Sequence, residues 1–346
     1  MIVVIGGVKV KVDLKMALPD APEEKPVRQT IRTTDDDYQT AYAERMAMED
    51  EFWGSGSQDN SFGGYSPVTE GKKDDIVVSH CGCAYNVARH LACMGEEVAF
   101  VSVVGKDPLG MSALAELSSM GEGVKNVKAI DVSAVRYIPG QTSVLVQIRN
   151  FIGDVEFTRA NENMLEMITP QIIDEAAYLL DGADAIMLDG SLPKETIEYI
   201  AGKYGGAKLF FDPASVEGGK KIADSGILGN FFSIMPGRSE AEAMFKGPIL
   251  GPDQLEAASS MFAASGVEKT VIKMKSGGIY YRDEKETGIV HPERILNYAD
   301  TSGAGDLVSA VVIYGIINGK ALGDSVRLAN DAVTGFLAEL SDERPY

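Results

Sequence analysis

A run of small and acidic residues near the carboxyl end of the chain combines anion-binding features with a group that can accept a proton. It reads Asp300-Thr301-Ser302-Gly303-Ala304-Gly305-Asp306 and passes directly into an apolar stretch over residues 307–317. The two glycines lack the Cβ atoms that would keep an anion from the backbone, and a helix beginning here offers free N–H groups and its positive dipole end. The run therefore predicts a phosphate-binding loop with a carboxylate beside it. An ordinary glycine-rich turn with Asp306 as helix N-cap is the alternative.

A second group of polar residues lies in the first third of the chain. Cys81-Gly82-Cys83-Ala84-Tyr85-Asn86 leads into a helical stretch that ends at Met94-Gly95, and the strand after it closes with Val-Val-Gly-Lys-Asp-Pro-Leu-Gly over residues 103–110. Near the amino end, Asp13 follows a short apolar run that ends in Gly6-Gly7. A carboxylate in this place can bind substrate hydroxyls or simply be a solvated strand-end residue, because Asp is frequent at turns.

These motifs together resemble the PfkB/ribokinase family of carbohydrate kinases, over about residues 76–340. The family's C-terminal signature is Asp-Thr-x-Gly-Ala-Gly-Asp, and its N-terminal pattern is Gly-Gly, three residues and Asn. The resemblance implies that Asp306 is the catalytic base. In the N-terminal pattern Cys81 replaces the first glycine of the pair, and the spacing from the first strand to the aspartate is slightly longer than usual. The remaining roles that the resemblance implies are an anion hole at Gly303, Ala304 and Gly305, and substrate binding by Asp13, Gly82 and Asn86.

The resemblance also implies a nucleotide and metal site in the second half of the chain. Pro236-Gly237-Arg238-Ser239-Glu240 is similar to the family's Asn-x-x-Glu element, in which the glutamate organises magnesium through water, and here Gly237 replaces the Asn. A lysine stands at position 275 where a glycine is common, and it could pair with phosphate as a point charge or face solvent. ATP and Mg²⁺ would be cofactors, with a monovalent cation beside the anion loop as in some relatives. The nucleotide-binding residues implied are Lys273, Lys275, Gly278, Thr301 and Asn330, with Glu240 at the metal.

The activity implied is the ATP-dependent phosphorylation of a sugar or nucleoside hydroxyl. In such an in-line transfer the protein positions the groups and stabilises charge, while a carboxylate accepts the hydroxyl proton. Within the family the chain is most similar to pseudouridine kinases, so we expect pseudouridine to be converted to pseudouridine 5'-phosphate. That closer similarity rests on segments that are less specific than the C-terminal signature, and some of them could be strand-end turns. They are residues 189–193, 211–216, 220–221 and 238–242.

Two alternatives to a pseudouridine kinase remain open. The first is a ribokinase or another sugar kinase of the same family. The second, from a different class, is a sugar- or nucleoside-binding protein that has lost turnover, which the departures at Cys81, Gly237 and Lys275 motivate. The intact loop before Asp306 argues against the second alternative.

The elements that must position these motifs alternate regularly after residue 80. Short β-branched or aromatic runs alternate with stretches whose apolar residues recur at helical spacing, which is typical of βαβ units and a parallel sheet covered on both faces. The predicted fold is therefore α/β, a ribokinase-like, three-layer α/β/α, doubly wound and mostly parallel sheet. Predicted strands cover residues 98–104, 185–188, 208–211, 231–235 and 270–274, and predicted helices cover 84–94, 170–180, 194–203, 254–264, 306–318 and 324–340.

Two regions break this alternation. Residues 143–149 and 155–159 alternate polar and apolar side chains around Gly153-Asp154. This pattern predicts a hairpin with one solvent-exposed face, and we expect the hairpin to be part of a small β lid. Residues 20–75 are rich in Asp, Glu, Gly, Ser and Pro, with one predicted helix over 36–52, and this composition favours a partly mobile insertion. We expect residues 1–19 and 76–346 to form the kinase domain, with lid strands within about 8–20, 70–80 and 143–159, and residues 20–75 to extend the lid region.

Histidine and cysteine side chains crowd one short segment, which raises the question of a zinc site. They lack the paired Cys-x-x-Cys or His-x-x-x-His spacing of zinc ligands, and buried thiols in such a loop and helix pack as small apolar groups. We therefore expect no structural zinc here. The residues concerned are His80, Cys81, Cys83, His90 and Cys93.

Charge and composition limit the partners. The formal net charge of −19 argues against nucleic acid or an anionic membrane surface as a partner, because neutralising phosphates requires clustered Lys and Arg. No apolar run has the length of a membrane span, the amino end lacks the features of a secretory signal, and the odd count of 3 cysteines is not a disulfide framework. We expect a cytoplasmic protein that binds a small-molecule substrate and forms a homodimer through its lid.

Overall fold

The computed structural model describes residues 1–15, 75–150, 155–274, 277–292 and 302–342. Within this described part, nine strands form the main sheet in the order β13-β12-β11-β10-β9-β8-β1-β4-β5. The strands from β11 to β5 are parallel, whereas β11, β12 and β13 pair antiparallel to one another at the edge. Their bounds are β1 (Ile2–Ile5), β4 (Val98–Gly105), β5 (Val135–Ile138), β8 (Ala185–Asp189), β9 (Leu209–Asp212), β10 (Ser233–Ile234), β11 (Lys269–Lys273), β12 (Ile279–Arg282) and β13 (Thr287–Val290).

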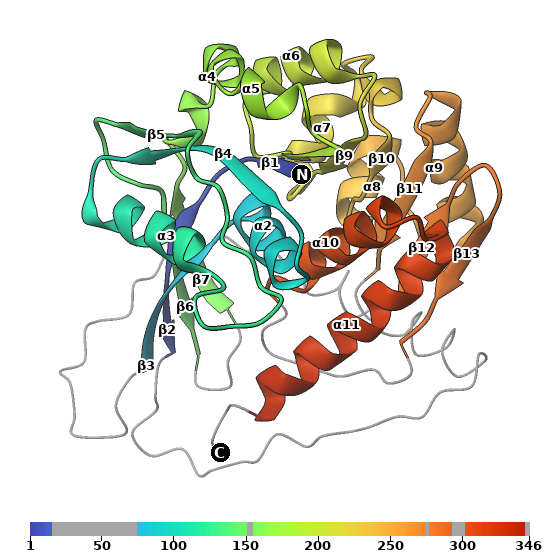
Figure 1. The fold of residues 1–346 in the computed structure, drawn as a ribbon. Coiled ribbons are helices and arrows are strands. Elements are labelled where there is room, and N and C mark those ends of the chain that lie inside the picture. Colours follow the sequence, from blue (N-terminus) through green and yellow to red (C-terminus); the bar gives the residue numbers. More distant parts are fainter. Residues whose placement is uncertain (16–74, 151–154, 275–276, 293–301, 343–346) are drawn as a thin grey trace, which may run out of the picture.

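Helices cover both faces of this sheet and create two apolar cores. Side chains alternate along β1, so Val3 and Ile5 pack into one core while Ile2 and Val4 pack into the other. The first core is covered by α4 (Pro170–Glu175), α5 (Ala177–Leu180), α6 (Lys194–Tyr204), α7 (Val216–Ala223), α8 (Arg238–Phe245) and α9 (Pro252–Ala264). The second is covered by α2 (Cys83–Cys93), α3 (Pro108–Ser119), α10 (Ala304–Ile317) and α11 (Leu322–Asp342), visible together in Figure 1.

A separate sheet of four described strands forms the lid. Its order is β3-β2-β6-β7, and in Figure 1 these strands extend away from the main sheet, below β4 and α3. The strand β2 pairs antiparallel with β3 and parallel with β6, and β6 and β7 form the predicted hairpin. The bounds are β2 (Lys9–Lys15), β3 (Asp75–Cys81), β6 (Val144–Arg149) and β7 (Val155–Asn161).

The order of the main sheet reverses beside β1, and this reversal places the site. From β1 the chain adds β4 and then β5 on one side, whereas β8, β9, β10 and β11 follow one another on the other side. In an open α/β sheet, ligands bind beyond the carboxyl ends of the strands at such a switch point. The residues that follow β1, β8 and β9 therefore lie at this switch point.

The predicted fold class is confirmed, with local differences. The predicted helix over residues 170–180 is divided at Ala176, which has φ −93° and ψ 4°, into α4 and α5. Within the strand predicted over residues 231–235, the observed strand covers only Ser233–Ile234, and residues 228–230 form a 3₁₀ turn before it. The predicted helix over 36–52 and the insertion over 20–75 lie outside the described residues. None of the described helices has the length and apolar character to cross a membrane.

Candidate active site

The residues around the switch point come from strand ends and helix starts. Gly6 follows β1, and a Cβ atom built there would lie 2.5 Å from the Cβ atoms of both Ala84 and Asp189, so only glycine lets α2 approach the sheet this closely. At the end of β8, Asp189 accepts a hydrogen bond from the Ala84 N–H at 3.2 Å. Gly82 precedes α2 with φ +132°, a conformation that favours glycine. The start of α2 is thereby fixed against β1 and β8.

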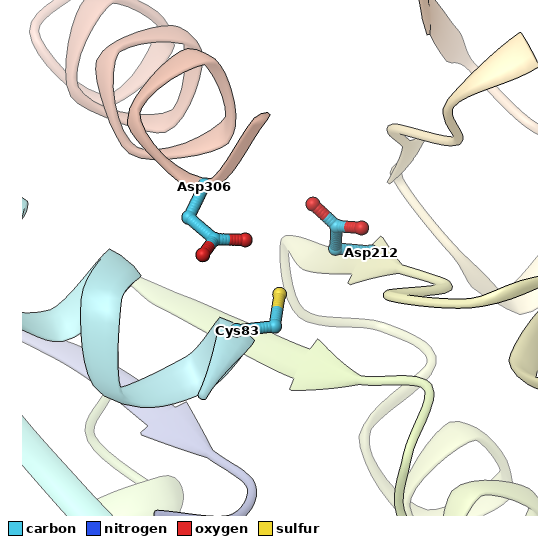
Figure 2. A group of neighbouring side chains, drawn as sticks. All are labelled: Cys83, Asp212 and Asp306. Atoms are coloured by element: carbon cyan, nitrogen blue, oxygen red, sulfur yellow. The ribbon is translucent and has the colours of Figure 1, made fainter. Parts of the chain in front are cut away.

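Asp306 lies at the centre of this arrangement. It occupies the first turn of α10, and its Oδ2 accepts a hydrogen bond from Asn86 Nδ2 at 2.7 Å. Figure 2 shows its side chain pointing into the same space as those of Cys83, at the start of α2, and Asp212, at the end of β9. The Sγ atom and one oxygen of each carboxylate lie within 4.8 Å of one another. The structure therefore brings the two sequence motifs together, since Asn86 and Asp306 are 220 positions apart in the chain.

Burial controls the protonation of Asp306. Removal from water, and next the negative charge of Asp212, raise the pKa of Asp306 to about 7, although hydrogen bonds from Asn86 and Cys83 and the charge of Lys273 oppose the shift. Burial also holds the pKa of the Cys83 thiol well above its ordinary value, with Asp212 and Asp306 adding to the effect. A carboxyl group with a pKa near neutrality can exchange a proton at physiological pH.

A second charged cluster lies beside Asp306. The Asp212 Oδ2 atom accepts hydrogen bonds from Lys273 Nζ at 2.6 Å and from Ser309 Oγ at 2.6 Å. Asp212 is buried, and the Lys273 ammonium also donates to Ser309 Oγ at 3.2 Å. Burial lowers the pKa of Lys273, but Asp212 and Glu240 raise it more, so this pKa lies above its ordinary value and the ammonium remains charged.

Glu240 is held close to this cluster by the start of α8. Its Oε2 accepts a hydrogen bond from the Gly237 N–H at 2.6 Å, which fixes the carboxylate at the helix N-terminus. Burial raises the pKa of Glu240, whereas Lys273 lowers it and Asp212 raises it. The carboxylate is therefore near the same lysine as Asp212, and its oxygen atoms are ligands of the type that Mg²⁺ binds.

The predicted anion loop forms the start of α10. Gly303 has φ +85°, which favours glycine, and its carbonyl accepts the first helical bond from the Leu307 N–H. Helix geometry leaves the N–H groups of Ala304, Gly305 and Asp306 without an intrahelical acceptor. These donors and the helix dipole make the loop a place where an anion can bind.

The other predicted nucleotide-binding residues lie on neighbouring elements. Gly278 has φ +88° in the turn between β11 and β12, where a Cβ atom would lie 2.3 Å from the Val290 carbonyl oxygen. Asn330 is buried in α11, which packs against α10. Lys275 and Thr301 lie outside the described residues.

Asp13 belongs to the lid. Its carboxylate pairs with Arg149 Nε at 2.9 Å and with Lys11 Nζ at 3.0 Å, on one face of the β2 and β6 strands. Lys9, on this face, lies opposite Cys81 in the strand register, and α2 begins two residues later, so the polar face of the lid adjoins the start of α2. The described contacts of Asp13 are with lid cations, and its role in substrate binding stays a prediction.

Several residues of the site were not singled out from the sequence for a role. Asp189 and Asp212 were noted only as parts of the less specific segments that resemble pseudouridine kinases. Each is the last residue of an apolar strand, and this position could have marked them as site residues. Ser309 could not be found from the sequence, because it lies within an apolar helix and its role depends on its hydrogen bond to Asp212. Cys83 was considered only as a zinc ligand. Within the described residues His80 bonds to Glu116, and His90 lies edge-on to Phe336, among other contacts.

The chain is similar to known proteins over most of its length. A sequence model described as pfkB family carbohydrate kinase matches residues 57–333. The pseudouridine kinase of Escherichia coli (strain K12) is 25% identical over 250 residues, which cover 72% of this chain and 76% of that protein. The guanosine-inosine kinase of Exiguobacterium acetylicum is 24% identical over 270 residues, 76% of this chain and 86% of that protein. The solved structure of Arabidopsis thaliana ribokinase complexed with ribose and ATP has a TM-score of 0.67 at 16% identity, covering 96% of this chain and 90% of that chain.

Proposed function

The chain belongs to the pfkB family of carbohydrate kinases, and from this premise we propose that it transfers the terminal phosphoryl group of ATP to a hydroxyl of pseudouridine. The observation that carries the proposal is the Asp306 carboxylate, which stands at the start of α10 beside an anion loop and accepts a hydrogen bond from Asn86 of α2. A carboxylate that can accept the hydroxyl proton and backbone donors that can bind phosphate are groups that a transfer from a phosphate to a hydroxyl uses.

The proposed step assigns separate tasks to Asp306 and to the loop. The substrate oxygen attacks the terminal phosphorus, the bond to the bridging oxygen breaks, and ADP leaves with the electron pair. Asp306 accepts the hydroxyl proton, for which a pKa of about 7 is suited at neutral pH. The N–H groups of Gly303, Ala304 and Gly305 face the developing negative charge on the phosphoryl oxygens. The hydrogen bond from Asn86 keeps the carboxylate oriented toward the substrate hydroxyl.

A divalent cation fits the donor set near the nucleotide side of the site. When bound, Mg²⁺ would neutralise charge on the phosphate oxygens. Glu240 would hold it through water, because its carboxylate is fixed by the Gly237 N–H and offers a hard oxygen ligand. ATP lies, in this proposal, between the anion loop and the residues Lys273, Gly278 and Asn330. A monovalent cation beside the loop stays a prediction.

The choice of pseudouridine rests on the similarity to the Escherichia coli pseudouridine kinase, at 25% identity. The sugar would be held by Gly82, Asn86 and the polar lid face that carries Asp13. The ADP formed with pseudouridine, uridine, guanosine, ribose and fructose should be measured by a coupled assay, and pseudouridine should give the highest kcat/KM. If another acceptor exceeds it by about tenfold, equivalent to roughly 1.4 kcal/mol of transition-state discrimination, the pseudouridine assignment is wrong.

The same panel tests the alternative of a binding protein without turnover. Calorimetry with each nucleoside and sugar measures binding independently of ADP formation. Binding of an acceptor without ADP formation from ATP and Mg²⁺ would favour that alternative. Turnover of any acceptor in the panel would exclude it.

We also propose that the lid forms a homodimer interface. The strand register places Val12, Leu14, Ile76, Val78 and Phe157 on the lid face opposite Asp13, and Ile76 and Val78 are 59% and 62% exposed. Exposed apolar side chains on a sheet are typical of an interaction surface. Val78→Lys should shift the chain toward a monomer in sedimentation velocity, and Val124→Lys, an exposed valine outside the lid, is the control. A monomeric wild-type chain at micromolar concentration would contradict the proposal.

A further inference from the structure

Lys273 lies at the carboxyl end of β11, directly beside the anion loop. A Cβ atom built on Gly305 would lie 3.8 Å from the Lys273 Nζ atom and 3.9 Å from its Cδ atom. The ammonium group and the free N–H groups at the start of α10 are therefore adjacent. A fixed positive charge next to such donors strengthens the binding of an anion in the loop.

The lysine side chain is held by groups from two other elements. Its Nζ atom donates to Asp212 Oδ2, from β9, at 2.6 Å and to Ser309 Oγ, from α10, at 3.2 Å. Ser309 in turn donates to the same Asp212 oxygen at 2.6 Å. A lysine ammonium has three N–H donors, and the contacts seen among the described residues use two of them. The third is left for a ligand.

The backbone beside Lys273 leaves room on the side of α8. Gly237, just before α8, forms an isolated parallel β-bridge with Lys273, and residues paired in a bridge project to the same face of the sheet. Gly237 has no side chain, and a Cβ atom there would have the Glu240 carboxylate, at 3.4 Å, as its nearest neighbour. Position 237 thus places no side chain over the ammonium, and the Glu240 carboxylate is the group that lies on this side of it.

We propose that the Lys273 ammonium binds the terminal phosphoryl group of the bound nucleotide and stays on it during transfer, with Asp212 and Ser309 as positioning residues. This inference rests on the proposed function and deepens it. The lysine remains protonated throughout, because the hydroxyl proton goes to Asp306 and the electron pair of the broken bond leaves with ADP. Its charge offsets the negative charge on the terminal phosphoryl oxygens.

The alternative is that Lys273 only pairs with Asp212 to support the fold. A buried ion pair by itself is weak evidence for a stabilising role. The same strand provides a matched control, since Lys269 at its other end pairs with Asp283 at 3.0 Å and is also half-buried. Lys273→Met and Lys269→Met each remove one Lys–Asp pair from β11, but only the first removes a cation beside the loop.

The test compares two probes that differ by the terminal phosphoryl group. With Mg²⁺ present, calorimetry measures binding of ADP and of the β,γ-imido analogue of ATP. Lys273→Met should weaken binding of the analogue by about tenfold or more, the scale of a charge-assisted contact, and change ADP binding by less than about threefold. Lys269→Met should change neither. Equal losses for both probes in Lys273→Met, or no loss, would overturn the inference.

Two further variants cover the case in which Lys273→Met does not fold. Lys273→Arg keeps the charge and should retain most of the preference for the analogue over ADP. Ser309→Ala removes one positioning contact and should reduce that preference by about threefold; an unchanged preference in Ser309→Ala contradicts the positioning role. A wild-type chain that binds neither probe and forms no ADP refutes the proposed function itself, whereas an active wild type with a neutral Lys273→Met refutes only this inference.

Discussion

Two regions of the molecule hold their charged groups in different ways: the lid, and the centre of the site around Asp306, Asp212 and Lys273. At the centre, Asp212 of β9 is bonded to Lys273 of β11 and Ser309 of α10, so three elements of the main core fix one carboxylate. In the lid, Asp13 is bonded to Arg149 and Lys11 from the same small sheet. The carboxylate at the centre is therefore held by bonds between elements of the main core, whereas the carboxylate of Asp13 is held within the lid sheet itself. We infer that the centre determines the rate and the lid determines which acceptor binds.

The largest effect is expected at Asp306. Asp306→Asn keeps the size of the side chain but removes the group that accepts the proton, so kcat should fall by at least about a hundredfold. Nucleotide affinity should be nearly unchanged, because the proton moves only as the transition state forms. Steady-state kinetics and calorimetry measure the two quantities separately. A variant with near-normal turnover would reduce Asp306 to a helix cap, and one that unfolds would make its role structural.

The pH dependence should report the electrostatics of the centre. Because Asp306 has a pKa of about 7, it is protonated below that pH, and kcat/KM should fall about tenfold per pH unit on the acid side. Asp212→Asn removes a like charge and so lowers the pKa of Asp306, which should move this acid limb to lower pH even if the rate also falls. The log kcat/KM profile from pH 5 to 9 measures both. An acid limb that stays in place in Asp212→Asn would show that Asp212 does not control Asp306.

A smaller effect, of another kind, is expected in the lid. Asp13→Asn removes a carboxylate from the polar lid face, so KM for the acceptor should rise by about tenfold while kcat changes less than about twofold. Asp283→Asn, which removes an aspartate paired with Lys269 outside the lid, is the matched control and should change neither. A fall in kcat with unchanged KM in Asp13→Asn would mean that lid and centre are not separable.

The smallest effect is on stability. The pKa of Asp306 lies near 7 in the folded chain against an ordinary value of 3.8, so its ionisation destabilises the fold progressively as pH rises through that interval. Asp306→Asn should therefore be more stable than the wild type at pH 8, by roughly 1–2 kcal/mol after allowing for solvent screening, and the difference should vanish toward pH 4. Urea unfolding at the two pH values measures this. A constant difference would contradict a buried, ionising Asp306.

The two regions also differ in how far the sequence predicts them. The glycine-rich start of α10 was predicted because its glycines and aspartate are consecutive in the chain, so that local geometry alone sets this turn. That it binds an anion stays a prediction. The β6–β7 hairpin was predicted because alternation along a strand is local too. The division of helix 170–180 at Ala176 was missed, since the apolar spacing continues through it. The edge strands β12 and β13 were not predicted either.

By itself the sequence determined the α/β class, the glycine-rich helix start at residues 303–305 and the family, because these depend on periodicity and on contiguous motifs. Only the tertiary structure decided that Asn86, separated from Asp306 by 220 positions, would bond to it. It likewise decided that Lys273 and Ser309, 61 and 97 positions from Asp212, would share one of its oxygens. Parallel strands bring their carboxyl ends to one edge of the sheet, so side chains far apart in sequence meet there. Removal from water then shifts the pKa values of these groups, and that burial exists only once both helical layers are packed.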